Sequence, residues 1–203
     1  MKLFHSHSSP FVRKITVLLH EAGQAAAVKM ETVKGSPLAP GSYPIALNPL
    51  GKIPALVTDD GQAIFDSRVI CRHLDDLFQT GLYPAAPDLW QVLTLEALAD
   101  GMLDASVLMR YEAVARPPEH QDAAWLEAQW AKVARALDAL ETGRSSVLEG
   151  PLNIGHIAVG CALGYLDFRH TDRNWADGRP KLGAWWREVA ARPSFTMTAP
   201  PAT

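Results

Sequence analysis

The sequence has no excess of positive charge. Its 203 residues carry 19 Lys and Arg against 22 Asp and Glu, which gives a formal net charge of −3. A protein that binds nucleic acid generally needs a basic surface to neutralise the phosphates. We therefore expect no nucleic-acid partner.

Cysteines and long apolar runs are also scarce. Cys71 and Cys161 are too few for a disulfide scaffold and do not have zinc-site spacing, and their apolar helical surroundings indicate buried side chains. No apolar run approaches the roughly 20 residues of a membrane span, and the first residues lack the apolar core of a signal peptide. We expect a cytoplasmic protein that makes no membrane contact.

The remaining composition is that of a folded protein, and the chain divides near its midpoint. Hydrophobic residues make up 48% and charged residues 20%, which excludes disorder of the whole chain. The Gly- and Pro-rich stretch 81–87 interrupts regular structure. We predict a first domain over 1–79, a linker over 80–87 and a second domain over 88–203, with a frayed tail from Thr198.

Strand and helix signals alternate before the linker. Apolar patterns predict strands near 2–4, 27–33, 54–58 and 63–65, and helices over 10–22 and 66–77. Asp59-Asp60-Gly61-Gln62 between the last two strands is a hairpin turn signal, because Gly supplies a positive φ. The order β-α-β, hairpin, α indicates an α/β domain with one mixed sheet.

The second half shows helix signals alone. We predict helices at about 88–112, 122–148, 153–169 and 180–192, separated by Pro- and Gly-containing breaks. This pattern is typical of an all-α bundle.

Ser9 stands where the first predicted helix begins, directly before Pro10. Its side chain is a favourable N-cap, which is a purely structural role. The same hydroxyl, beside the positive end of the helix dipole, would also stabilise a bound thiolate. A nucleophilic serine is a third interpretation, but no Gly-x-Ser-x-Gly motif supports it.

Two further segments before the linker are candidate ligand contacts. In Asn48-Pro49-Leu50-Gly51-Lys52-Ile53-Pro54, a cis Ile53–Pro54 bond would leave the Ile53 main chain free at the sheet edge for a peptide-like ligand. Asp66-Ser67 begins the next helix and is predicted to cap it, and in addition Ser67 would bind a carboxylate and Asp66 an amino group. Together with Ser9, these sites suit an extended anionic peptide that bears a thiol.

These segments resemble the cytosolic glutathione S-transferases, and more narrowly their small bacterial members with a Ser-Pro-x-x-Arg-Lys start. The resemblance covers essentially the whole chain and rests on three motifs in order: Ser8-Ser9-Pro10-Phe11-Val12-Arg13-Lys14, Asn48-Pro49-Leu50-Gly51-Lys52-Ile53-Pro54-Ala55-Leu56 and Phe65-Asp66-Ser67-Arg68-Val69-Ile70. It implies a thioredoxin-like N-terminal domain followed by an all-α C-terminal domain.

The resemblance also implies an activity and a site. The activity is conjugation of glutathione, as co-substrate and without a metal, to a small electrophile by a detoxifying homodimer, with Ser9 as the catalytic residue that stabilises the thiolate. The glutathione-binding residues it implies are Ser9, Phe11, Lys52, Ile53, Pro54, Asp66 and Ser67. The alternatives are a non-catalytic binding or regulatory protein of this fold and a glutathione-dependent reductase or lyase.

The sequence indicates the pocket for the second substrate less specifically than it indicates the glutathione-binding residues. Met102, Ser106, Met109 and Arg110 share one broad helix face and are our candidates for its lining, with core packing as the alternative for the methionines. Asp100 and Asp104, one turn apart, are expected on a solvated helix face, and the alternatives are a catalytic or metal-binding pair or a place in the cleft that faces the first domain. His5-x-His7 is interpreted as a polar strand end, because no third metal ligand follows at useful spacing.

Overall fold

The strand β1 (Lys2–His5) lies inside a four-stranded mixed sheet with the order β2-β1-β3-β4. It pairs in parallel with β2 (Lys29–Thr32) and antiparallel with β3 (Ala55–Val57), and β4 (Ala63–Ile64) forms the hairpin with β3. Leu3 lies opposite Leu56, and both side chains are fully buried. The four predicted strands and their mixed sheet are confirmed.

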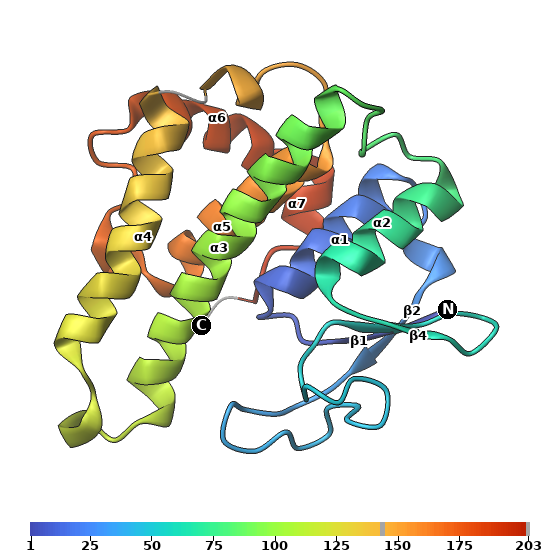
Figure 1. The fold of residues 1–203 in the computed structure, drawn as a ribbon, viewed down its shortest axis with the longest axis horizontal. Coiled ribbons are helices and arrows are strands. Elements are labelled where there is room, and N and C mark those ends of the chain that lie inside the picture. Colours follow the sequence, from blue (N-terminus) through green and yellow to red (C-terminus); the bar gives the residue numbers. More distant parts are fainter. Residues whose placement is uncertain (143–144, 202–203) are drawn as a thin grey trace. The chain divides into compact units, whose positions relative to one another are not determined.

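Two helices lie side by side on one face of this sheet (Figure 1). The helix α1 (Pro10–Glu21) buries Ile15, Leu18 and Leu19. The helix α2 (Ser67–Phe78) buries residues three and four apart, such as Ile70 and Leu74, against the same core. A single 3-10 turn, η1 (Ala25–Ala27), leads from α1 to β2.

The computed structural model describes residues 1–142 and 145–201, which fall into two units. The first unit is Met1–Tyr83 together with the chain end from Pro193, and the second is Pro84–Arg192. The chain end therefore belongs by its contacts to the first unit, whereas we had placed it in the C-terminal domain. The boundaries at 79 and 88 stay a prediction.

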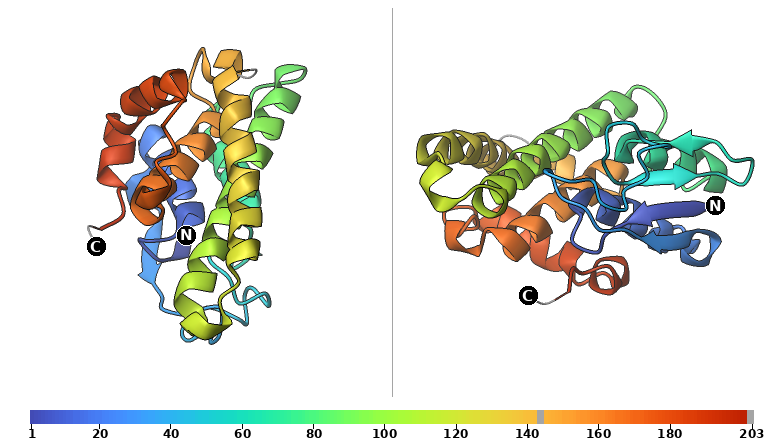
Figure 2. Two further views of the ribbon diagram at one scale, coloured as in Figure 1. Left: turned by 90° about the vertical axis from the view of Figure 1, so that its left-hand side faces the viewer. Right: turned by 90° about the horizontal axis from the view of Figure 1, so that it is seen from below.

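The second unit contains helices throughout its described part, as predicted. Its long helices are α3 (Asp88–Ala115), α4 (Ala123–Thr142), α5 (Ile154–Arg169) and α6 (Pro180–Ala190), with the short 3-10 helices η2 (Pro118–His120), η3 (Ser145–Leu148) and η4 (Thr171–Arg173). The helix α5 packs against α3 and is buried on all sides from Ile154 to Leu166 (Figure 2). A Cβ at Gly155 would approach the Leu95 side chain to 2.9 Å, so glycine permits this close packing.

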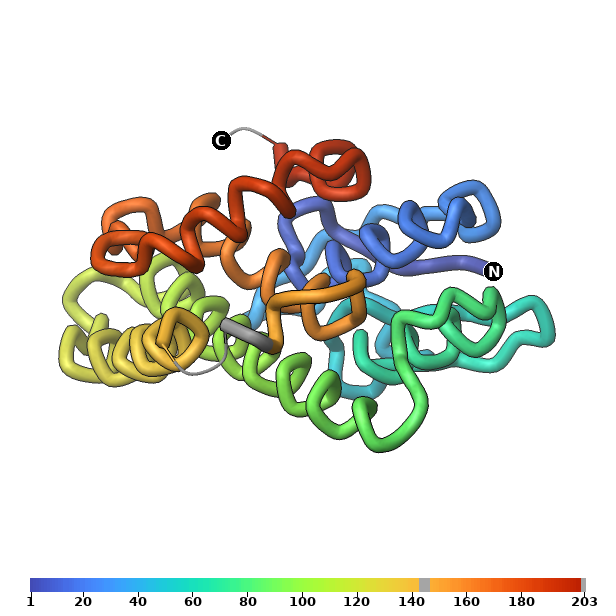
Figure 3. The backbone as a smooth tube through the Cα atoms, turned by 90° about the horizontal axis from the view of Figure 1, so that it is seen from above, coloured from blue at the N-terminus to red at the C-terminus, as the bar shows by residue number. Residues whose placement is uncertain are grey.

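Two differences from the prediction concern helix ends. The predicted helix 122–148 appears as α4 and η3, and residues 143–144 of that prediction lie outside the described residues. The short helix α7 (Pro193–Met197) was not predicted, because Pro193 reads as a helix end. Proline also suits a first helical turn, and buried Phe195 holds α7 beside α1 (Figure 3).

Both cysteines are buried, as expected. The described residues include no helix long and apolar enough to cross a membrane.

Candidate functional site

Ser9 is the N-cap of α1, and its side chain forms the capping hydrogen bond. Its Oγ accepts a hydrogen bond from the Val12 main-chain N–H at 3.3 Å, while Pro10 occupies the first helical position. Accepting this bond uses a lone pair and leaves the hydroxyl proton available. In the described part of the chain that proton has no acceptor, so the capping role and a donor role toward a ligand are compatible.

The neighbouring serines differ from Ser9 in this respect. Ser6 Oγ and Ser8 Oγ lie 3.1 Å apart and hydrogen-bond to each other. Ser9 is tied to the same turn through its main chain, because its N–H donates to the Ser6 carbonyl at 3.0 Å. Of the three serines, only Ser9 combines a position at the helix start with a side-chain proton that no described residue accepts.

The loop before β3 is held by a residue that the sequence analysis did not single out for binding. Asn48 is 2% exposed, its Nδ2 donates to the Lys52 carbonyl at 2.8 Å, and its Oδ1 accepts from the Leu50 N–H at 3.1 Å. Gly51 has φ +60°, which lets the loop turn between these two bonds. Asn48 thereby fixes the chain immediately before Ile53, and the predicted cis Ile53–Pro54 bond is confirmed.

Asp66 and Ser67 stand at the N-terminus of α2. Asp66 is the exposed N-cap, and its Oδ1 accepts from the Arg68 N–H at 2.9 Å. Ser67 is the first residue of the helix and is 3% exposed. The predicted helix cap is therefore confirmed, and the binding roles of both residues stay a prediction.

The register of the sheet brings these three segments to the same end of the sheet. Phe4 pairs with Ala55, so the chain that leaves β1 toward Ser9 and the chain that enters β3 from Ile53 lie at one end of the sheet. Ile64 pairs with Leu56, so β4 leads to Asp66 at that same end. Phe11 is half-buried in the first turn of α1, and Lys52 is exposed.

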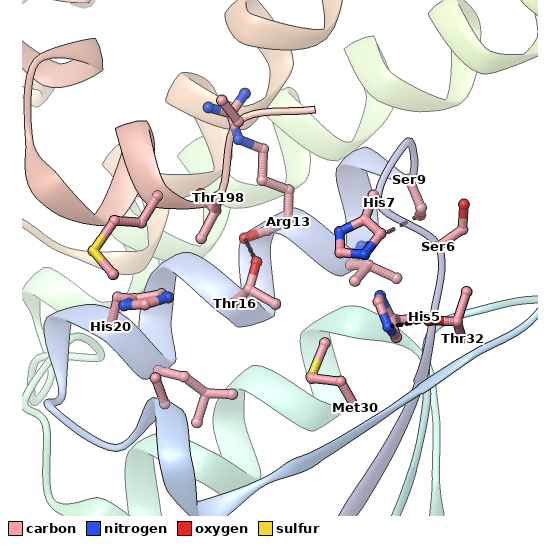
Figure 4. A pocket seen from close by; sticks show the side chains of 15 residues that line it. His5, Ser6, His7, Ser9, Arg13, Thr16, His20, Met30, Thr32 and Thr198 are labelled. Atoms are coloured by element: carbon pink, nitrogen blue, oxygen red, sulfur yellow. Dashed lines mark hydrogen bonds between the residues drawn. The ribbon is translucent and has the colours of Figure 1, made fainter. Parts of the chain in front are cut away.

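A cavity of about 380 Å³ lies along α1, on the side of the helix that faces β2 and residues 197–199 (Figure 4). We call it the α1 cavity. The side of α1 that lines it carries Ser9, Val12, Arg13, Thr16, Leu19 and His20, at helical spacing. Its other walls come from the end of β1 and the following turn, from Met30 and Thr32 of β2, and from residues 197–199. Ser9 therefore lines this cavity and also follows β1 at the end of the sheet where Ile53 and Asp66 lie.

His5, the last residue of β1, and His7, in the turn that follows, both line the α1 cavity. His5 is buried with its Nε2 3.0 Å from Thr32 Oγ1, and its ring stands edge-on to that of His7 with centroids 4.7 Å apart. Burial, and then the nearby His7, lower the pKa of His5. The described residues include no group of three or more His, Cys, Asp or Glu side chains that could hold a metal ion.

The four candidates for the second-substrate pocket lie on α3 of the second unit. Met102, Ser106 and Met109 are each at most 3% exposed, and Arg110 is half-buried. The Ser106 hydroxyl donates to the Met102 carbonyl at 2.8 Å, and its own carbonyl lies 3.0 Å from His170 Nε2. Their role in a pocket stays a prediction. The solvated face expected for Asp100 and Asp104 is wrong for Asp100, which is 1% exposed.

Two side chains missed by the sequence analysis are the cavity residues Arg13 and His20. The available signal was their spacing from Ser9, because residues 9, 13, 16 and 20 follow one another at intervals of four, three and four on one helix face. We had followed only the apolar face through Val12, Ile15 and Leu19.

The fold, with its four-stranded mixed sheet and following helical unit, is that of a thioredoxin-like domain joined to an all-α domain. Two family models match the chain: the glutathione S-transferase N-terminal domain over residues 8–77 and the glutathione S-transferase C-terminal domain over residues 123–188. The GST-like protein YibF of Escherichia coli K12 is 36% identical, with 99% of each chain covered. Glutathione S-transferase 3 of Zea mays is 29% identical, with 98% of this chain and 92% of the relative covered.

Solved structures agree with these matches. A glutathione transferase family member from Pseudomonas fluorescens Pf-5, solved with bound glutathione, superposes with a TM-score of 0.95 at 48% identity, covering 99% of each chain. A second structure from the same organism holds S-(propanoic acid)-glutathione and gives a TM-score of 0.91 at 47% identity over the full length of both chains. The chain belongs to the glutathione S-transferase family.

Proposed function

We propose that this protein binds glutathione and transfers its thiolate to a small electrophile, with Ser9 donating a hydrogen bond to the sulfur. The observation that carries the proposal is the Ser9 hydroxyl, which caps α1 through its oxygen and keeps its proton available beside the helix N-terminus. A donor in this position favours the thiolate, which is the nucleophilic form. The relative that holds glutathione supports this choice of ligand.

The remaining contacts follow from the chemistry of the tripeptide. The main chain of Ile53 pairs with the cysteinyl part, and Lys52 and Pro54 border it. The Ser67 N–H and hydroxyl bind the γ-glutamyl carboxylate at the start of α2, where the helix dipole favours negative charge. Asp66 faces the amino group, and Phe11 packs beside Ser9.

In the reaction, the thiolate sulfur attacks an electrophilic carbon and forms a carbon–sulfur bond. A leaving group departs with its electron pair, or the electrons of a conjugated double bond move onto the substrate and are neutralised by a proton from water. The relative with S-(propanoic acid)-glutathione accommodates such a thioether. The chain's own contribution is to bind glutathione, orient its sulfur and hold it deprotonated.

The alternative activities have less support. A reductase that forms a mixed disulfide through its own thiol needs an accessible cysteine, and the two cysteines of the chain are both buried. The homodimer, the cytoplasmic location and the detoxifying role are proposed from the family.

Isothermal calorimetry and a turnover assay test this function together. We expect saturable heat of binding with glutathione, and conjugation to 1-chloro-2,4-dinitrobenzene faster than the uncatalysed reaction. Absence of both binding and turnover at millimolar glutathione would refute the proposal. Binding without conjugation of any electrophile in a panel of aryl halides, epoxides and disulfides would favour the regulatory alternative.

A further inference from the structure

The second unit contains two half-buried arginines without an acidic partner. Arg110 lies near the end of α3, and Arg169 is the last residue of α5, which packs along α3 (Figure 1). The Arg169 guanidinium lies over the Phe168 ring, 3.7 Å from its centre. Neither guanidinium forms an ion pair or a hydrogen bond with any described residue. We call these two residues the arginine pair.

Contacts between α3 and the end of α5 bring the pair to one place. His170 Nε2 lies 3.0 Å from the Ser106 carbonyl, and Arg110 follows Ser106 by one turn of α3. Tyr165 stands one turn before Arg169 on α5, and its ring packs edge-on against that of His170 with centroids 6.1 Å apart. Residues one turn apart share a helix face, so Arg110 and Arg169 both lie near Tyr165.

The Tyr165 hydroxyl is a polar group without a partner. The residue is 6% exposed, and its hydroxyl forms no hydrogen bond with any described residue. Among the described residues, Arg13 Nε is the one fully enclosed side-chain polar atom that lacks a partner, so the Tyr165 hydroxyl must reach open space. Burial raises the pKa of Tyr165 to about 12, although the charges of Arg169 and Arg110 oppose this shift. The hydroxyl is therefore a protonated donor beside two cations at neutral pH.

The acidic residues nearest to the arginine pair in the sequence have other partners. Glu112 Oε2 lies 2.7 Å from Arg116 Nε. Asp167 accepts hydrogen bonds from two tryptophan indoles, each at 2.6 Å, and Asp172 lies 3.9 Å from Arg173. The described part of the chain thus supplies no carboxylate to the pair. Two positive charges that act on each other at a half-buried site are unfavourable unless an anion joins them.

We propose that Arg110, Arg169 and the Tyr165 hydroxyl bind the carboxylate of a small organic acid. A planar guanidinium matches the two oxygens of a carboxylate, and the hydroxyl adds a further donor. The half-buried Phe168 ring offers apolar surface to the carbon part of the ligand. Arg110 is also a candidate for the second-substrate pocket, so an electrophile that carries a carboxylate is one such ligand. The carboxylate site itself does not depend on the proposed function.

Benzoate and benzamide are matched probes, because they share a ring and a size and differ in charge. Isothermal calorimetry with the full chain, in a buffer without phosphate, should show saturable binding of benzoate and none of benzamide. Arg110→Gln and Arg169→Gln should each raise the Kd for benzoate by roughly tenfold or more, because each removes a charged donor. Arg135→Gln removes an exposed arginine of α4 outside the pair and should leave the Kd unchanged.

Tyr165→Phe tests the third group and carries the test if an arginine variant does not fold. It keeps the aromatic ring beside His170 and removes the hydroxyl alone, so the Kd for benzoate should rise while the thermal unfolding midpoint of the free protein stays near the wild-type value. Equal Kd values for benzoate and benzamide would overturn the inference. A Kd for benzoate that Arg110→Gln, Arg169→Gln and Tyr165→Phe all leave unchanged would do the same.

Inhibition of the conjugation of 1-chloro-2,4-dinitrobenzene separates two sources of the carboxylate. Benzoate that competes with the aryl halide, and loses this effect in Arg110→Gln, assigns the site to the second substrate. Benzoate that binds through the arginine pair without competing assigns it to a separate organic acid. A chain that binds benzoate in this way but conjugates no electrophile refutes the proposed function and leaves this inference standing. An active enzyme that does not bind benzoate overturns this inference alone.

Discussion

The main-chain N–H of Arg13 donates to the carbonyl of Ser9 at 3.0 Å, which is the first hydrogen bond of α1. The two side chains consequently lie one turn apart on the face of the helix that lines the α1 cavity. One residue has an available hydroxyl proton at the helix start, and the other has a buried positive charge. One helical turn therefore separates the Ser9 hydroxyl from the residue whose guanidinium donates to the Phe195 carbonyl.

Asn48 is predicted to support glutathione binding through the loop it holds. Asn48→Ala removes two hydrogen bonds of a buried side chain, to Lys52 and Leu50, and is expected to lower the free energy of unfolding by about 1–3 kcal/mol. The main chain before Ile53 then loses its support, so the Kd for glutathione should rise. Urea unfolding and calorimetry measure the two effects.

Asn153→Ala is the matched control for that experiment. Asn153 caps α5 in the second unit by accepting from the His156 N–H at 3.1 Å, so its loss is expected to cost about 1 kcal/mol of stability. It does not touch the loop before β3. Equal weakening of glutathione binding in Asn48→Ala and Asn153→Ala would show that general destabilisation, and not the loop, explains the effect.

Acid is predicted to destabilise the helical unit through two histidines. Burial lowers the pKa of His156 and of His170 from the usual 6.5, outweighing the hydrogen bonds of their rings to the Val147 and Ser106 carbonyls. Above pH 6.5 both rings are neutral in the folded and unfolded chain. Below it the unfolded chain takes up protons first, so stability falls as the pH decreases toward the folded pKa values.

Urea unfolding near pH 7.5 and pH 5.5 measures this loss. His156→Gln keeps a donor toward the Val147 carbonyl but removes one titrating group, so its stability should change less between the two pH values than that of the wild type. Equal stability of the wild-type protein at both pH values would contradict the prediction.

A homodimer is predicted from the family, and α2 offers apolar surface for an interface. Val69 and Leu77 are 52% and 50% exposed, although solvated helices usually carry polar residues at such positions. Sedimentation equilibrium at micromolar concentration should give twice the chain mass of 22.1 kDa. The double variant Val69→Glu, Leu77→Glu is expected to shift the mass toward one chain, and a wild-type mass of one chain would refute the dimer.

The sequence predicted the fold and the sheet edge better than the cavity. Strands, helices and N-caps at Ser9 and Asp66 follow from local patterns, because apolar periodicity and capping chemistry act over a few residues. The Ile53–Pro54 bond was predicted from a ligand requirement and family resemblance, against the local preference for trans.

The α1 cavity could not be predicted in the same way. Its walls join α1, the strand pair β1 and β2, and residues 197–199, which are far apart in the chain. The short helix α7 depends on such a long-range contact, since Arg13 donates to the Phe195 carbonyl and Ser194 hydrogen-bonds to Glu21. Arg13 reads in the sequence as an ordinary surface arginine, and only the tertiary packing buries it.

The central claim is that the Ser9 hydroxyl stabilises the thiolate of bound glutathione, and the pKa of that thiol tests it most directly. Titrating the thiolate absorbance of the protein–glutathione complex should give a pKa well below the roughly 8.5 of a free thiol. Ser9→Ala should raise that pKa and slow conjugation roughly tenfold to a hundredfold near neutral pH, because a hydrogen bond to a charged group contributes about 1.5–3 kcal/mol. Ser8→Ala, in the same turn, should leave both quantities near the wild-type values. An unchanged thiol pKa and rate in Ser9→Ala across pH 6 to 8, with the loss appearing in Ser8→Ala or Ser6→Ala, would contradict the account.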